Sequence, residues 1–476
     1  MQEIRKADPV SAVIGLRAKL VSAFSPARWL SWQQASVNRR IFSAMLTVGM
    51  LTLLVKVAAT FKEMVIARKL GVADSLDAYL VAFALPAFVM NLITGTLNAV
   101  LIPTYIQVRD QNGREAAQKL FSSVVVWVVL LLTVVSVLMG LSGPHALRFI
   151  GANFDADKMA LTQTLFFALI PTIVLSGLAT TWGAVLNAGE RFALTAATPI
   201  ATPLMLVLFV YFSGVAWQPF ALALGTVAGE VLRCTLLARG LKRQGISILP
   251  RWHGPSSALI QIRNQCAPMI AGSCLTCSSL LVDQSMAAML GAGSVSVLNY
   301  SSKIVAVVVG IGSVALTTAV LPQFSRMVAA DDWAGIKNVL RTYIPLILMA
   351  TIPATAVLIL CSKPLVSLLF VGGAFTAQDG QEVVRVQSLY LLQLPFYALV
   401  NLLIRLIASM KANHVLMRGA AINFAFNISL NYLLMRWLGV AGIALSTSIV
   451  YVISLTYLSF MLMRLLKKRT GACAAC

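Results

Sequence analysis

Long, uninterrupted runs of apolar residues constrain this chain more than any other feature. The sequence is 59% hydrophobic and 11% charged, whereas soluble globular domains carry about 25% charged residues. A chain this apolar cannot cover its surface against water and needs lipid as its solvent. Only helix bundles and closed barrels satisfy backbone groups in lipid, and continuous rather than alternating apolar runs favour helices. The sequence therefore predicts an all-α membrane protein.

Twelve apolar segments are each long enough to cross about 30 Å of hydrocarbon. They are residues 41–60, 78–102, 121–143, 160–186, 193–213, 217–238, 267–289, 296–321, 343–362, 386–409, 416–435 and 439–463. The expected domains are a basic cytoplasmic N-terminal segment (1–40), an N-terminal six-helix lobe (41–238), a cytoplasmic linker (239–266), a C-terminal six-helix lobe (267–465) and a cytoplasmic tail (466–476).

Lysine and arginine are distributed unevenly between the two ends of these spans. If the N-terminus is cytoplasmic, 25 of the 37 basic residues fall in cytoplasmic segments and eight on the opposite side. This bias predicts that both termini face the cytoplasm. It also explains most of the net charge of +21 without nucleic-acid binding. The basic segment 1–40 fits either an amphipathic helix on anionic lipid or a disordered tail that sets topology.

An internal repeat relates the two predicted halves. The stretch from Leu70-Gly71 to Pro103 has an echo from Leu290-Gly291 to Pro322, and the two prolines are 219 residues apart. Six predicted spans separate the copies, so both halves have the same topology. This is a parallel repeat, with two lobes related by an axis along the membrane normal and a central cavity between them. Such an architecture is typical of transporters.

Basic residues within or beside the spans are the candidates for a binding site. A charge at mid-membrane costs about 3 kcal/mol on insertion scales, so it requires a partner, water or a function. Lys56 lies late in the first span, with Lys62 and Arg68 just beyond it; Lys303 lies early in the eighth span and Arg405 in the tenth. Snorkelling or anchoring could explain each cation alone. Together they predict a cationic cavity that binds a phosphate or pyrophosphate group.

Acidic residues near the same spans are candidate charge partners or gating residues. They are Glu63, Asp77 and Asp283. Asp77 could pair with Lys56 or Lys62, in a pair that breaks and re-forms as the lobes move. Asp283 has no local partner in the sequence and could face the cavity. Glu230 and Arg233 are expected to form a structural pair within one helix.

No enzyme or metal-binding motif is recognisable. The three histidines are isolated, and neither CxxC pair, at Cys274 and Cys277 or at Cys473 and Cys476, has further ligands. The sequence contains no phosphate-binding P-loop, HExxH motif or nucleophile elbow. We therefore expect a protein that is not an enzyme and has no metal or cofactor, with H⁺ or Na⁺ as a possible coupling ion.

The run from Lys62 to Gly71, followed by Asp77 to Pro86, resembles the first two helices of the MurJ/MviN lipid II flippases. This family belongs to the multidrug/oligosaccharidyl-lipid/polysaccharide exporter superfamily. The segment from Asn299 to Lys303 resembles helix 8 of the family, and the resemblance covers about residues 41–465. It implies that Lys56, Lys62, Lys303 and Arg405 match basic cavity positions and that Asp77 matches an acidic one.

The chain also departs from the family pattern. A basic position in the second helix is Met90 here, and the family usually has arginine where this chain has Lys56, Lys62 and Lys303. Lysine keeps the charge but loses the bidentate geometry of arginine. Two C-terminal helices that commonly form a lipid-tail groove are expected to be missing. These departures leave room for an exopolysaccharide or O-antigen unit in place of lipid II.

The sequence thus predicts a flippase of the bacterial inner membrane. It would move a polyprenyl-pyrophosphate-linked saccharide, either lipid II or an exopolysaccharide or O-antigen unit, to the outer leaflet by alternating access. Its expected partners are this substrate and membrane lipids, with envelope-biosynthesis enzymes as further candidates. Two alternatives stay open: a cation-coupled multidrug exporter of the same superfamily, whose cavity should be acidic, and a non-transporting scaffold for envelope assembly.

Overall fold

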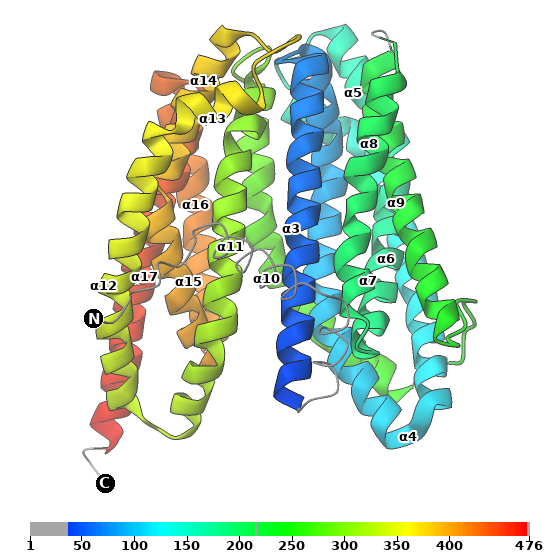
Figure 1. Ribbon diagram of the computed structural model, residues 1–476, viewed down its shortest axis with the longest axis vertical. Helices are drawn as coiled ribbons and strands as arrows, with labels where there is room; N and C mark the ends of the chain where they lie inside the picture. The colour runs from blue at the N-terminus through cyan, green and yellow to red at the C-terminus, as the bar shows by residue number, and fades with distance from the viewer. Residues whose placement is uncertain (1–36, 215–216, 255, 411, 474–476) are drawn as a thin grey trace, which may run out of the picture.

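The computed structural model describes residues 37–214, 217–254, 256–410 and 412–473, and these form two helical lobes (Figure 1). The predicted basic segment 1–40 lies mostly outside the described residues. The N-terminal lobe contains α3 (Val37–Leu70), α4 (Asp74–Ile150), α5 (Ala156–Leu169), α6 (Pro171–Ala188), α7 (Phe192–Ala197), the 3₁₀ turn η1 (Thr198–Ile200), α8 (Ala201–Phe212) and α9 (Gln218–Arg243). The C-terminal lobe contains α10 (Ser257–Ala288), α11 (Ser294–Ala329), α12 (Trp333–Leu360), α13 (Ser362–Leu369), α14 (Ala377–Leu391), α15 (Leu394–Ser409), α16 (Asn413–Leu438) and α17 (Val440–Cys473).

Each of the twelve predicted spans coincides with a helix or with consecutive helices. Several helices extend beyond the predicted spans, because a helix does not have to end where the hydrocarbon ends. Thus α4 contains the second and third spans, and its direction changes at Gly113, whose φ of 84° is outside the helical range. In the described part of the chain, seven helices are long and apolar enough to span a membrane by composition alone. Ser294–Gly310 of α11 is apolar as well, but shorter.

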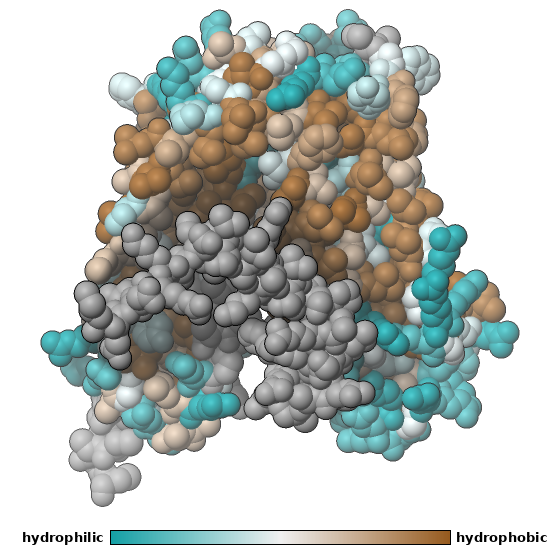
Figure 2. Space-filling view, viewed as in Figure 1, coloured by the Kyte–Doolittle hydropathy of each residue, from teal (hydrophilic) through white to brown (hydrophobic). Residues whose placement is uncertain are grey.

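The two lobes meet at one end and separate towards the other (Figures 1 and 2). We call these the closed end and the open end. A broad apolar band lies between polar surfaces at the two ends, as expected for a membrane protein (Figure 2). Two of the segments predicted to be cytoplasmic, the turn within α4 at Gly113 and the loop between α11 and α12, lie at the open end (Figure 1).

The hydrophobic core is continuous across both lobes at the closed end. One cluster of buried residues includes Ile66 and Leu76 of the N-terminal lobe together with Tyr300 and Phe370 of the C-terminal lobe. The rings of Tyr300, Phe370 and Phe375 contact one another at centroid distances of 5.2–6.0 Å. Separate clusters fill the rest of each lobe. Apolar packing therefore contributes to closure at this end.

The repeat seen in the sequence is also present in the structure. Gly71 follows α3 and Gly291 follows α10, and both have positive φ values, 64° and 117°. The pairs α3–α4 and α10–α11 are thus equivalent helix–turn–helix units, one in each lobe, and both turns lie at the closed end.

The ion pair predicted between Glu230 and Arg233 within α9 is confirmed, since Arg233 Nη1 lies 3.3 Å from Glu230 Oε2.

The linker between the lobes is shorter than the predicted 239–266, because α9 continues to Arg243 and α10 begins at Ser257. Gln118, Ser122 and Ser123 of α4 hold the backbone of this linker by hydrogen bonds at Ser247, Leu249, Arg251 and His253. Leu259 and Ile262, at the start of α10, belong to the buried core of the N-terminal lobe. The first part of α10 therefore packs with the N-terminal lobe.

A close contact between α8 and α9 gives a first prediction. A methyl group added at Gly229 would lie 2.5 Å from the Thr202 Cα atom, whereas one added at Gly95 would meet nothing within 4 Å. We expect Gly229→Ala to lower stability by about 1–3 kcal/mol through overpacking. The control Gly95→Ala should unfold at or above the parent temperature, because alanine favours helix. Thermal unfolding in detergent, followed by intrinsic fluorescence, would measure both; equal midpoints would contradict the prediction.

Candidate substrate site and gate

A buried carboxylate joins the two lobes at the closed end. Asp77, in the first turn of α4, has no exposed surface. Its Oδ2 accepts a hydrogen bond from the amide of Gly293 at 2.7 Å, and its Oδ1 accepts from the amide and hydroxyl of Ser296 at 2.8 and 2.6 Å. Gly293 is the N-cap of α11 and has no side chain to cap its own helix. Asp77 of one lobe therefore caps a helix of the other.

The charge partner of Asp77 is Lys158, not Lys56 or Lys62 as the sequence suggested. Lys158 Nζ, in the first turn of α5, lies 3.2 Å from Asp77 Oδ2 and also binds Asp74. It stands 4.2 Å from the centroid of the Phe154 ring. The expected pairing was wrong because the chain brings α5, 81 residues further on, over the start of α4. No spacing pattern in the sequence links these positions.

We call the contacts of Asp77 with Lys158, Gly293 and Ser296 the gate. Near the gate, two lysines, one from each lobe, share a single carboxylate. Glu63 Oε1 of α3 lies 2.8 Å from Lys62 Nζ and 3.0 Å from Lys303 Nζ of α11. The side chains of Lys62 and Lys303 are 21% and 34% exposed, whereas that of Glu63 is only 9% exposed. The group therefore has two positive charges and one negative charge, and both lysine side chains keep part of their surface exposed. We refer to these three residues as the lysine group.

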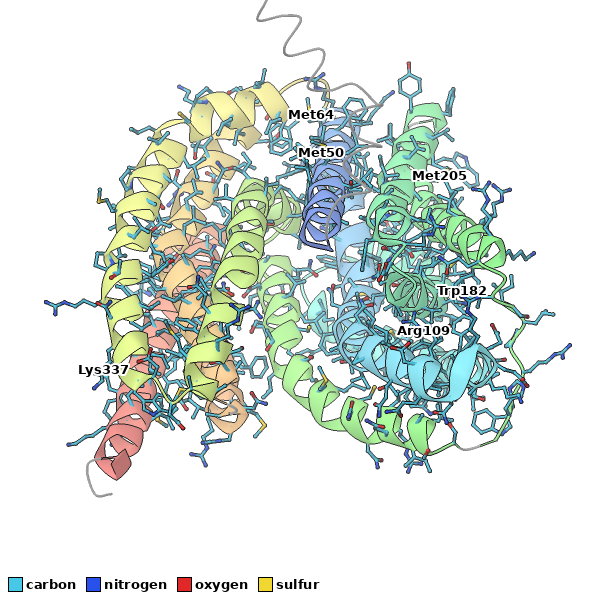
Figure 3. The ribbon with its side chains drawn as sticks, turned by 60° about the horizontal axis from the view of Figure 1, so that its bottom comes forward. Met50, Met64, Arg109, Trp182, Met205 and Lys337 are labelled. Carbon is cyan, nitrogen blue, oxygen red and sulfur yellow. The ribbon has the colours of Figure 1, made fainter. Side chains whose placement is uncertain are left out.

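Lys56 is exposed on α3, on the open side of the lysine group. Seven residues separate it from Glu63, which is about two helical turns or 10.5 Å along the same face of the helix. Figure 3 shows α3, marked by Met50 and Met64, on the side of its lobe next to α11. Lys56 thus continues the positive stripe from the lysine group towards the open end.

Arg68 lies on the other side of the lysine group, at the closed end of α3. Its side chain is exposed, and its carbonyl accepts a hydrogen bond from the amide of Ala374 at 2.9 Å. The structure therefore does not bring the Arg68 side chain into the lysine group. Its backbone instead takes part in the contact between the lobes.

Asp283 and Arg405 lie within the C-terminal lobe. Asp283 Oδ1, on α10, accepts hydrogen bonds from Asn427 and Asn431 of α16, at 3.1 and 2.6 Å. Arg405 is half-buried on α15, and its Nε atom is buried without a hydrogen-bond partner. Among the residues that the structure describes, no hydrogen bond or ion pair joins either side chain to the lysine group. The five basic candidates therefore do not form one cluster.

Several residues of the gate were missed from the sequence. Lys158 lies between two predicted spans and was not among the candidate residues, and Gly293 and Ser296 carry no charge that would indicate a role. The repeat does hold a signal, because Gly293 and Ser296 follow Gly291, the echo of Gly71. Within the described ranges, no group of three or more His, Cys, Asp or Glu side chains could hold a metal ion.

Comparison with known proteins identifies the family. A family model described as "Lipid II flippase MurJ" matches residues 66–474. The "Probable lipid II flippase MurJ" of Vibrio cholerae is 24% identical over 427 residues, covering 87% of this chain and 81% of the relative. The "Lipid II flippase MurJ" of Burkholderia cenocepacia is 27% identical over 365 residues, covering 74% of this chain and 70% of the relative.

Solved structures agree with this assignment at the level of the fold. A lipid II flippase MurJ in an inward closed conformation has a TM-score of 0.74 at 22% identity and covers 88% of this chain and 87% of its own. An inward-facing multidrug resistance transporter of the MATE family also gives 0.74, at 12% identity, covering 88% and 99%. An outward-facing MATE structure gives 0.62, at 12% identity, covering 90% and 96%. The chain belongs to the lipid II flippase MurJ family.

Proposed function

We propose that this chain is a flippase that moves lipid II, a polyprenyl-pyrophosphate-linked saccharide, from the inner to the outer leaflet of the bacterial inner membrane. One observation supports this most directly: a lysine from each lobe converges on Glu63 just inside the closed end of the lobe interface. A pyrophosphate entering from the open end would compete with the Glu63 carboxylate for both ammonium groups. Lys56 would meet the headgroup on its way in.

The transport cycle follows from the same geometry. With N- and C-termini in the cytoplasm, the open end faces the cytoplasm and the closed end faces outward. The headgroup binds between the lobes, the lobes close behind it, and the contacts at Asp77 break to release it outside, while the polyprenyl tail stays in lipid. No residue of the chain is proposed to make or break a covalent bond. An H⁺ or Na⁺ gradient or the membrane potential would supply the energy.

The positive charge of the lysine group separates this proposal from a multidrug exporter. The MATE neighbours share the fold at 12% identity, but a cationic drug would be repelled by Lys62 and Lys303. A drug-resistance assay on cells that overproduce the chain should therefore show no change in tolerance to cationic drugs. A clear rise in tolerance would favour the exporter.

Complementation tests the proposed function itself. We expect this chain to restore growth of a bacterial strain depleted of its own lipid II flippase, and to expose lipid II to an externally added degrading enzyme. A failure of both readouts, with the chain inserted in the membrane at normal levels, would refute the assignment to lipid II. If lipid-linked exopolysaccharide or O-antigen units become exposed instead, the substrate is one of these.

A further inference from the structure

The short turn between α13 and α14 makes a main-chain hydrogen bond with the other lobe. This turn, residues 371–376, lies against the end of α3. The Ala374 amide donates a hydrogen bond to the Arg68 carbonyl at 2.9 Å, and nearby Tyr300 donates its hydroxyl to the Gly71 carbonyl at 3.4 Å. Arg68 is in the last turn of α3, where carbonyl groups have no partner within the helix. The turn thus caps α3 from the opposite lobe.

We infer that the closed end is locked by reciprocal helix capping, in which each lobe caps a helix of the other, and that residues 371–376 form a latch that sets how often the closed end opens. Asp77 of the N-terminal lobe caps the start of α11. Ala374 of the C-terminal lobe caps the end of α3. When the lobes separate at this end, both helices lose their caps together. Closure therefore depends on a backbone contact as well as on the charged side chains.

Glycines make this close approach possible. A methyl group added at Gly373 would lie 2.2 Å from the Arg68 carbonyl oxygen, and one added at Gly71 would lie 2.3 Å from the Ala374 carbonyl oxygen. Both clashes are with backbone atoms, which cannot rotate away. The two glycines also have positive φ values, 61° and 64°, which other residues rarely adopt. Each lobe thus contributes one glycine to the latch.

Gly373→Ala and Gly71→Ala test the latch from opposite sides. Gly439→Ala is the matched control, because Gly439 has a φ of 61° but nothing within 4 Å of an added methyl group. Spin labels at Ala152 and Gln381, both exposed and one on each lobe, would report the distance between the lobes at the closed end. The labels require a background in which the seven native cysteines are replaced. The measurement is electron–electron distance spectroscopy in lipid nanodiscs without substrate.

We expect either latch variant to raise the fraction of molecules with a long interlabel distance by roughly fivefold. This is the change in population that corresponds to the stability lost with one helix cap. Gly439→Ala should leave the distribution unchanged. Unchanged distributions in both latch variants would overturn the inference. So would an equal increase in Gly439→Ala, because backbone strain would then explain the effect.

Hydrogen–deuterium exchange on the unmodified chain keeps the inference testable if the variants do not fold. The Ala374 and Ser296 amides are predicted to exchange at similar, slow rates, because the same opening event exposes both. Fast exchange at residues 371–376 beside slow exchange at Ser296 would show that the turn is not a latch. The proposed function requires such opening, but neither experiment uses a substrate. A negative result here therefore leaves the complementation test of lipid II transport unaffected.

Discussion

Replacing Lys62 or Lys303 with alanine is expected to abolish complementation of a flippase-depleted strain without preventing membrane insertion. Each lysine places an ammonium group within 3.0 Å of the same carboxylate oxygen, at the interface of the two lobes. A charge-assisted hydrogen bond contributes about 1.5–3 kcal/mol, so losing one should weaken headgroup binding by roughly 10- to 100-fold. Binding of a pyrophosphate-headed lipid to the purified protein would measure this directly.

Matched variants separate the site from a general effect of charge. Lys337→Ala removes an exposed lysine on α12, on the far side of the C-terminal lobe from α3 (Figure 3), and should complement fully. Lys62→Arg and Lys303→Arg keep the charge and should retain activity, because a guanidinium group also donates hydrogen bonds to a carboxylate or a phosphate. If Lys62→Ala and Lys303→Ala variants both still complement, the lysine group is not the headgroup site.

The helices of this fold could be predicted from the sequence because lipid imposes a strict length and composition on each span. The turn at Gly113 is an example of a feature that this rule does not predict. Residues 103–120 lie between two predicted spans, yet α4 is helical on both sides of Gly113. Hydropathy reports where a chain leaves the hydrocarbon, and it does not report where the backbone hydrogen bonds end.

The candidate site was only partly predictable. The charges within or beside the spans and the family resemblance both indicated Lys62 and Lys303, and the structure brings these two together through Glu63. Arg405 and Asp283 were chosen because charges inside a span are costly. That argument identifies polar positions but not their direction, and Asp283 faces two asparagines of its own lobe.

The gate was the least predictable part, because it depends on contacts between segments far apart in the chain. Asp77 reaches Ser296, 219 residues away, and Lys158, 81 residues away. The latch adds a contact between Arg68 and Ala374 in which only main-chain atoms take part. Main-chain contacts do not depend on charged or polar side chains, so composition and charge do not predict them. A glycine at the point of close approach is the only residue type that indicates them.

The second large effect is expected at Lys158. Asp77 is fully buried, and Lys158 is the cation that balances it within the N-terminal lobe, with a side chain that is only 8% exposed. Lys158→Met would leave Asp77 with hydrogen-bond donors but without a positive partner. Removing one member of a buried pair costs about 3–5 kcal/mol. We therefore expect a marked fall in thermal stability in detergent, whereas Met in place of the exposed Lys363 at the same end should change little.

Removing both charges distinguishes a buried ion pair from a simple loss of packing at Lys158. The double variant Asp77→Asn/Lys158→Met leaves no unbalanced buried charge, so it should unfold at a higher temperature than Lys158→Met alone. Its closed end should nevertheless open more readily, because the Asp77→Asn change replaces one carboxylate oxygen, an acceptor for the α11 amides, with an NH₂ group. If the double variant is no more stable than Lys158→Met, the pairing with Asp77 is not what Lys158 contributes. The same spin labels at Ala152 and Gln381 would then show whether the gate still depends on the cap that Asp77 provides.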